Sequence, residues 1–192
     1  CGCIRCYQAY VSETTRRRRI CIGKTKNTDT LYQLVDPFTL FYFQVMRKAD
    51  AYDANYWSNN QNTHLYSAWS GLSFEMLCLN HVDQIKSALG ISGISSNVFS
   101  WAGKGYDRSA QIDMLIDRAD RTINLCEMKF HNKPYTMTKN DEEDIERKVS
   151  SFKEATKTDK SIIVTMITTT GLERNEHSEG IQKVITLDQL FC

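Results

Sequence analysis

Residues 111–130, QIDMLIDRADRTINLCEMKF, constrain the fold of this chain more than any other stretch. Two apolar runs flank the short polar segment ADR, a pattern typical of a β-hairpin with a tight turn. Charges interrupt the apolar pattern at Asp113, Glu127 and Lys129. Because side chains alternate across a strand, Glu127 and Lys129 share one face, and pairing of the two strands brings Asp113 toward Glu127. The sequence therefore predicts a charged cluster at one end of a sheet.

The second run, residues 122–130, is largely apolar on both of its faces. This pattern indicates a central strand that is covered on both sides. Along the whole chain, apolar periods of 3.6 and 2 residues alternate, which predicts an α/β (α+β) fold with a mixed sheet between helices. In chain order we expect a hairpin with strands 3–11 and 31–36, a helix over 38–50, a helix over 63–89 ended by Gly90, strands over 97–104, 110–118 and 122–130, a helix over 140–157, a strand over 161–171, and a last strand with a closing turn over 183–191.

The polar segment 51–62 divides the chain into a head, residues 1–50, and a body, residues 63–192. The net charge of +1 hides an excess of positive charge in the head. Four arginines, Arg16, Arg17, Arg18 and Arg19, occupy its basic hairpin tip. They are candidates for binding the phosphates of a nucleic acid, which would make binding depend on salt. The alternative is a solvated loop without a ligand.

The seven cysteines and the first twenty residues bear on the compartment. No apolar run approaches the length of a membrane span, and no secretory signal precedes the cysteines. We therefore expect reduced thiols, a cytoplasmic location and no contact with a membrane. The chain does not begin with Met, so we also expect it to be a piece of a longer protein. The cluster CGCIRC at the N-terminus has no clear partner for a structural metal.

Two carboxylates that approach each other in a partly dry place repel, and a divalent cation compensates them best. Asp113 and Glu127 supply the hard oxygen donors that suit Mg²⁺ or Mn²⁺. Glu75 borders the apolar stripe of the expected helix and could join them. Lys129 could then orient a water or stabilise charge on a phosphate, which makes a complete set for phosphodiester hydrolysis. The alternative for Asp113, Glu127 and Lys129 is a set of surface salt bridges at the sheet end.

Lys148 lies beside Val149 on the expected helix over 140–157. It could reach a nucleic-acid phosphate, and the alternative is a solvated lysine at the flank of the helix.

Asp113 followed by Glu127-x-Lys129 on the next strand, behind a helix with Glu75, resembles the PD-(D/E)XK nuclease superfamily. The stretches LYQLVDPFTLFYFQVM, WSGLSFEMLCLNHVDQIKSALG and ITLDQLF also resemble the C-terminal region of a prokaryotic family of AAA-type ATPases. The resemblance implies a restriction-endonuclease-like fold for residues 63–192 and the end of a winged helix for residues 1–50. It also implies that Glu75, Asp113 and Glu127 hold the metal and that Asp113, Glu127 and Lys129 are catalytic.

Two departures from this family are visible. Ile112 stands where the superfamily motif has proline, and the chain has no G-x-x-x-x-G-K-[ST] segment, so we expect no ATP site within it. The resemblance supports two hypotheses. One is a Mg²⁺-dependent nuclease that acts on DNA within a larger ATPase. The other is a catalytically silent module that docks DNA or a protein partner for that ATPase. A homo-oligomer is also compatible with both.

Overall fold

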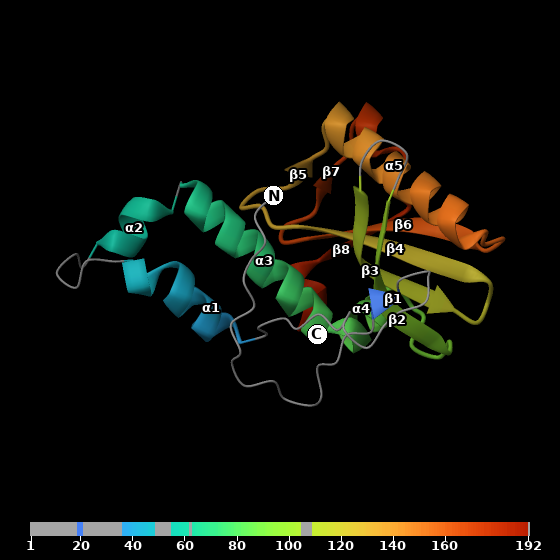
Figure 1. Cartoon of the computed structure of the whole chain (residues 1–192), viewed down its shortest axis with the longest axis horizontal. Helices are drawn as coiled ribbons and strands as arrows, with labels where there is room; N and C mark the ends of the chain where they lie inside the picture. Colours follow the sequence, from blue (N-terminus) through green and yellow to red (C-terminus); the bar gives the residue numbers. More distant parts are fainter. Residues whose placement is uncertain (1–18, 21–35, 49–54, 62, 105–108, 192) are drawn as a thin grey trace.

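The computed structural model describes residues 19–20, 36–48, 55–61, 63–104 and 109–191. Three expected elements lie partly or wholly outside these residues. They are the strand at 3–11, all but residue 36 of the strand at 31–36, and residues 49–50 of the helix over 38–50. The described part has mixed α and β structure around one main sheet (Figure 1). The α/β class expected from the sequence is therefore confirmed.

The main sheet has six strands in the order β1-β2-β3-β4-β6-β8. β2, β3 and β4 pair antiparallel in that order, whereas β4, β6 and β8 are parallel to one another, and β1 pairs with β2 in parallel. A second, two-stranded sheet pairs β5 with β7. The strand bounds are β1 Arg19–Ile20, β2 Ser96–Lys104, β3 Ser109–Arg118, β4 Thr122–Lys129, β5 Tyr135–Thr136, β6 Ser161–Thr168, β7 Leu172–Glu173 and β8 Lys183–Thr186.

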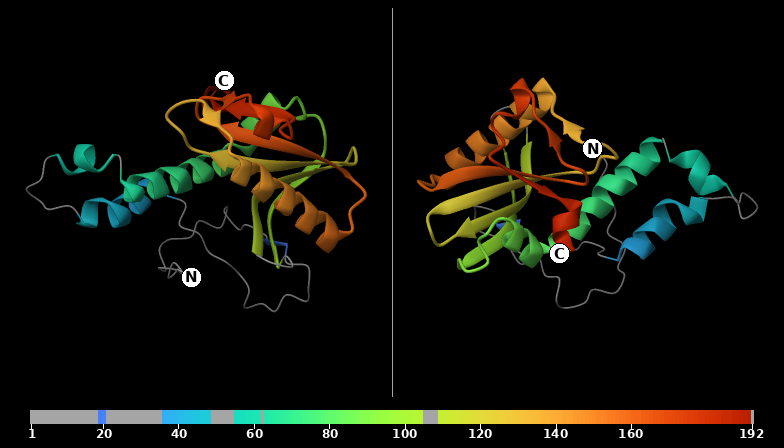
Figure 2. Two further views of the ribbon diagram at one scale, coloured as in Figure 1. Left: turned by 90° about the horizontal axis from the view of Figure 1, so that it is seen from above. Right: turned by 180° about the vertical axis from the view of Figure 1, so that it is seen from behind.

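Helices cover both faces of the main sheet. Helix α5 (Lys139–Thr156) lies on one face, where its Phe152 packs edge to face on Trp101 of β2 with ring centroids 5.5 Å apart. Helices α3 (His64–Asn80) and α4 (Val82–Ala88) cover the other face together with the short helix η4 (Leu187–Leu190) (Figure 2). The apolar residues of the two faces form separate buried clusters, so the sheet is the middle layer of three.

The remaining helices lie at the margins of this three-layer body. Helix α1 (Pro37–Gln44), the turn η2 (Met46–Lys48) and helix α2 (Tyr56–Asn60) extend beyond the sheet beside the first half of α3 (Figure 1). The turn η3 (Glu176–Ser178) lies near α5. The side chain of Asp36 caps α1 and Pro37 occupies its first turn, as expected from the sequence. None of the described helices combines the length and apolar character that crossing a bilayer requires.

The strand β4 is central, as the sequence indicates, because it lies between β3 and β6 and is buried over most of its length. Its Leu125 packs in the cluster under α5, and its Cys126 packs in the cluster under α3. Burial also raises the pKa of the Cys126 thiol, because the thiolate would lose its hydration there. The two faces of the β3–β4 hairpin thus contribute to different core clusters.

The single helix expected over 63–89 is wrong, because the chain breaks at His81 between α3 and α4. The backbone of His81 leaves the helical region, with φ −115° and ψ 34°, and its Nδ1 lies 2.8 Å from the carbonyl oxygen of Leu77. The expected apolar stripe of Leu65, Trp69, Leu72, Met76 and Leu79 is correct only in part, because the buried residues of α3 are Ser70, Phe74, Met76 and Cys78. The helix ends as expected near Gly90, whose φ of 72° favours glycine.

Candidate functional site

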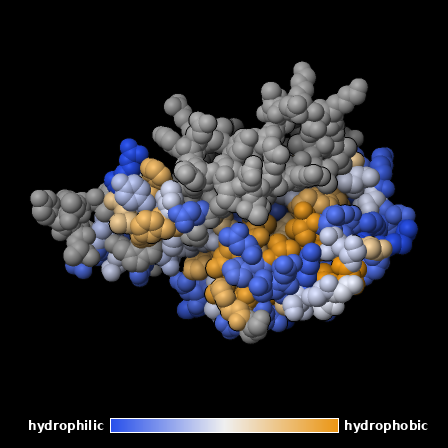
Figure 3. All heavy atoms as spheres, turned by 90° about the horizontal axis from the view of Figure 1, so that it is seen from below, coloured by the Kyte–Doolittle hydropathy of each residue, from blue (hydrophilic) through white to orange (hydrophobic). Residues whose placement is uncertain are grey.

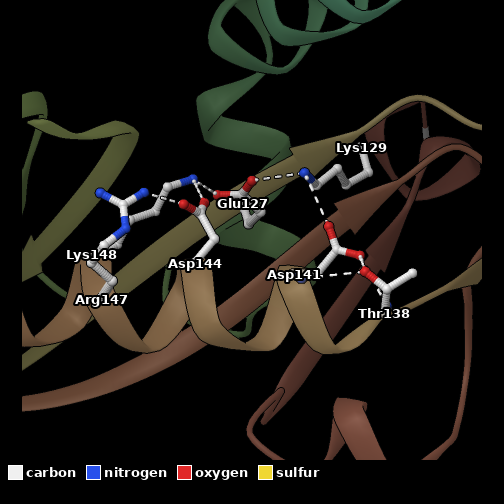
Figure 4. A network of polar contacts seen from close by, with 7 residues as sticks. All are labelled: Glu127, Lys129, Thr138, Asp141, Asp144, Arg147 and Lys148. Atoms are coloured by element: carbon white, nitrogen blue, oxygen red, sulfur yellow. Dashed lines mark hydrogen bonds and ion pairs between the residues drawn. The ribbon is translucent and has the colours of Figure 1, made fainter. Parts of the chain in front are cut away.

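The charged end of β4 faces α5. Glu127 is only 7% exposed, and Lys129, two residues farther along the same face, places its Nζ 3.2 Å from Glu127 Oε1. A carboxylate at such depth is costly unless a partner compensates it. The sequence prediction that Glu127 and Lys129 lie together on one face at the sheet end is confirmed (Figure 4).

Helix α5 supplies a second cation to Glu127. Lys148 Nζ lies 2.8 Å from Glu127 Oε2 and 3.0 Å from Asp144 Oδ2, and the Lys148 side chain is 12% exposed. The interpretation of Lys148 as a solvated flank is therefore wrong. Asp144 stands one helical turn before Lys148, and it also pairs with Arg147. Both oxygens of Glu127 thus have an ammonium partner.

The same helix supplies an anion to Lys129. Asp141 Oδ1 lies 3.7 Å from Lys129 Nζ, while its Oδ2 accepts hydrogen bonds from the backbone N–H and the hydroxyl of Thr138. These bonds belong to a capping box at the start of α5. Asp141 also accepts a hydrogen bond from Tyr135, whose ring centroid lies 6.0 Å from Lys129 Nζ. The carboxylate of Asp141 therefore takes part in capping the start of α5 and also pairs with Lys129.

The charges of this network compensate one another. It joins three carboxylates and three cations from β4 and α5 (Figure 4), namely Glu127, Asp141, Asp144, Lys129, Arg147 and Lys148. Burial disfavours the charged form of Lys148, but the nearby Glu127 and Asp144 outweigh this effect and raise the pKa of Lys148. For Asp144, burial likewise raises the pKa, but Lys148 and Arg147 lower it by more. Lys148 and Asp144 are therefore held in their charged forms near neutral pH.

Asp113 lies at an irregularity of β3. The pairing of β3 with β2 shifts between Phe99 and Trp101, so that Ser100 faces both Asp113 and Met114. Two residues opposite one make a β-bulge, which bends a strand and turns side chains away from the regular alternation. The alternation expected for Asp113 from the sequence therefore does not apply along the whole strand.

The pairing of β3 with β4 ends at Met114 opposite Cys126. Asp113 and Glu127 are the next residues on the two strands, just beyond the last pair. Asp113 is partly exposed, and its Oδ1 accepts a hydrogen bond of 2.8 Å from the side-chain amide of Gln111. The backbone thus places the two acids on neighbouring strands at the same end of the sheet, and the expected approach of their carboxylates stays a prediction.

Glu75 comes from the other side of the sheet. It lies half-buried on α3 beside the buried Phe74, whereas Glu127 faces α5. Burial first, and the charge of Glu75 to a smaller extent, raise the pKa of Cys78 to about 12. In the described part of the chain, no three His, Cys, Asp or Glu side chains converge to hold a metal ion. Metal binding by Asp113, Glu127 and Glu75 therefore stays a prediction.

The residue types nevertheless suit a hard cation. Carboxylate oxygens are the donors that Mg²⁺ prefers, and Glu127 and Asp113 present them on adjacent strands. An ion bound at Glu127 would have to replace an ammonium group, because Lys148 and Lys129 occupy its two oxygens.

The other predicted site residues are in the head. Arg16, Arg17 and Arg18 lie outside the described residues, and Arg19 belongs to β1, where only its backbone is described. Their role in binding nucleic acid stays a prediction. Sequence reasoning also missed Asp141 and Asp144. Asp144 and Lys148 follow Asp141 by three and seven residues, so all three lie on one face of the helix. This spacing was the feature of the sequence that could have revealed them.

Comparison of the chain with family models, with curated proteins and with solved structures found no match.

Proposed function

We propose that residues 63–192 are a restriction-endonuclease-like domain that hydrolyses phosphodiester bonds in DNA, with Mg²⁺ or Mn²⁺ as cofactor. The observation that carries the proposal is the pair of Glu127 and Lys129. The Glu127 residue is 7% exposed, and its carboxylate lies 3.2 Å from the ammonium nitrogen at the end of the central strand. An acid and a lysine in this arrangement supply a metal ligand and a group for the phosphate. The proposed setting is a larger cytoplasmic ATPase, with or without homo-oligomerisation.

Each residue has a proposed role. Asp113 and Glu127 would hold the metal ion, and Glu75, which comes from the helix on the opposite face of the sheet, would support it past the end of the β3–β4 pairing. The ion would supply charge neutralisation at the phosphate and a more acidic water. Lys129 would orient the attacking water or stabilise the negative charge that develops on the phosphate. Asp141, which is fixed by the capping box of α5, would hold the Lys129 ammonium in place for either task.

The test is cleavage of labelled single-stranded and double-stranded DNA by the full chain with Mg²⁺ or Mn²⁺. Lys129→Ala should lower the cleavage rate by about 100-fold or more, the typical cost of removing a group that stabilises a transition state. Lys153→Ala, which removes an exposed lysine from the last turn of α5, is the matched control and should keep the rate. Cleavage that survives in Lys129→Ala with the fold intact would contradict the assigned site.

A second function is a catalytically silent module that docks DNA or a protein partner for the ATPase. The observation that favours it is the closure of the charge network, since Lys129 and Lys148 already compensate both oxygens of Glu127. Such a module would bind DNA in the presence of a chelator. Replacing Arg16 to Arg19 with glutamine should then weaken binding and reduce its salt dependence by about four phosphate contacts at most. Metal-dependent cleavage would exclude a silent module.

A further inference from the structure

Lys148 lies between two acids that differ in their exposure to solvent. Its Nζ lies 2.8 Å from Oε2 of Glu127 on β4 and 3.0 Å from Oδ2 of Asp144 on its own helix. The Glu127 side chain is 9% exposed and the Asp144 side chain 37% exposed. The lysine therefore bridges a buried carboxylate to one at the surface (Figure 4).

The buried partner has little access to water, so its charge must be compensated by a cation from the protein or by one from solution. In this structure the cation is the ammonium of Lys148, assisted by Lys129 at 3.2 Å from the other oxygen. A divalent ion at the same carboxylate would lie within a few ångströms of Lys148, where two positive charges repel strongly. Binding of the ion and retention of the ammonium at Glu127 therefore oppose each other.

Asp144 is a second ion-pair partner for the Lys148 ammonium. It stands four residues before Lys148 on α5, a spacing at which side chains of a helix meet. Lys148 keeps this ion pair when it leaves Glu127, so no unpaired buried ammonium results. Arg147 shares Asp144 and lies on the more exposed side of the network, with a side chain that is 34% exposed.

We infer that Lys148 is an internal counter-cation that competes with a divalent metal ion for Glu127, and that Asp144 retains Lys148 after the ion has displaced it. This inference rests on the proposed function, because it takes Glu127 as a metal ligand. It makes metal affinity a property of α5 as well as of the two acids on the sheet. A reciprocal coupling follows, in which the ion weakens the contact of Lys148 with Glu127 by the same factor.

The experiment is a calorimetric titration of Mn²⁺ into the full chain, without nucleic acid. Lys148→Met should tighten Mn²⁺ binding by about tenfold, within the range of about 5- to 150-fold that is common for coupled sites. Lys153→Met removes the same charge from an exposed position on the same helix and should change the affinity less than about twofold. Glu127→Gln should abolish binding at this site. If Lys148→Met does not fold, Lys148→Gln replaces it.

The outcomes separate this inference from the proposed function. Binding that Glu127→Gln abolishes but Lys148→Met leaves unchanged or weakens would overturn the competition and keep the metal site. Absence of binding to both the wild type and a folded Lys148→Met variant, or binding that Glu127→Gln leaves intact, would overturn the proposed metal site and the competition with it. Tighter binding in Lys148→Met, with the Lys153→Met control unchanged, would support both.

Discussion

Removal of the Lys148 ammonium tests how much the network contributes to folding. Loss of one partner of a buried ion pair costs about 3–5 kcal/mol, because the other charge stays buried without compensation. Here the side chains of Glu127 and Lys148 are 9% and 12% exposed, but Lys129 remains 3.2 Å from the second oxygen of Glu127. Lys148→Met should therefore lower the free energy of unfolding by about 2–3 kcal/mol, below the full cost of an uncompensated charge.

The assay is urea unfolding of the wild type, Lys148→Met, Glu127→Gln and the double variant. The double-mutant cycle should give a coupling energy of about 1–3 kcal/mol between Glu127 and Lys148. The exposed pair of Lys139 and Glu143, at 3.7 Å with side chains 75% and 61% exposed, is the control. Lys139→Met should change stability by no more than about 0.5 kcal/mol. A coupling energy below about 0.5 kcal/mol for the buried pair would refute the reasoning.

Three further predictions concern the core and the start of α5. Phe152→Ala should cost about 3–5 kcal/mol in urea unfolding, because Phe152 is 2% exposed and packs on Trp101; a cost near that of a surface substitution would contradict this packing. Cys78, whose pKa burial raises to about 12, should resist alkylation at pH 8 until the chain unfolds, as measured by mass spectrometry of its peptide. For Asp141, burial raises the pKa, but hydrogen bonds from Thr138 lower it by more. Its stabilising contribution should therefore be complete above the unfolded value of about 3.9 and be lost as the pH falls through the lower folded value. The difference in Tm between wild type and Asp141→Asn should shrink below about pH 4; a constant difference down to pH 2 would show that the charge is not involved.

Much of the fold was predictable because local patterns agreed with it. The run of residues 122–130 indicated a central strand, and β4 is buried between β3 and β6. Glu127 and Lys129 could be placed on one face from the alternation of side chains alone. The break at His81 was not predictable from periodicity, because the apolar pattern continues through it.

The sequence determined those parts of the site that lie within one strand or within one helix. A two-residue period sets Glu127 beside Lys129 whatever surrounds them, and a helical period sets Asp141, Asp144 and Lys148 on one face of α5. Only the tertiary structure decided that these two sets meet, because the register of α5 on the sheet pairs Lys148 with Glu127 and Asp141 with Lys129. Contacts between elements depend on how both pack, which no local period contains. The bulge at Asp113 is of the same kind, since it exists only in the pairing of β3 with β2.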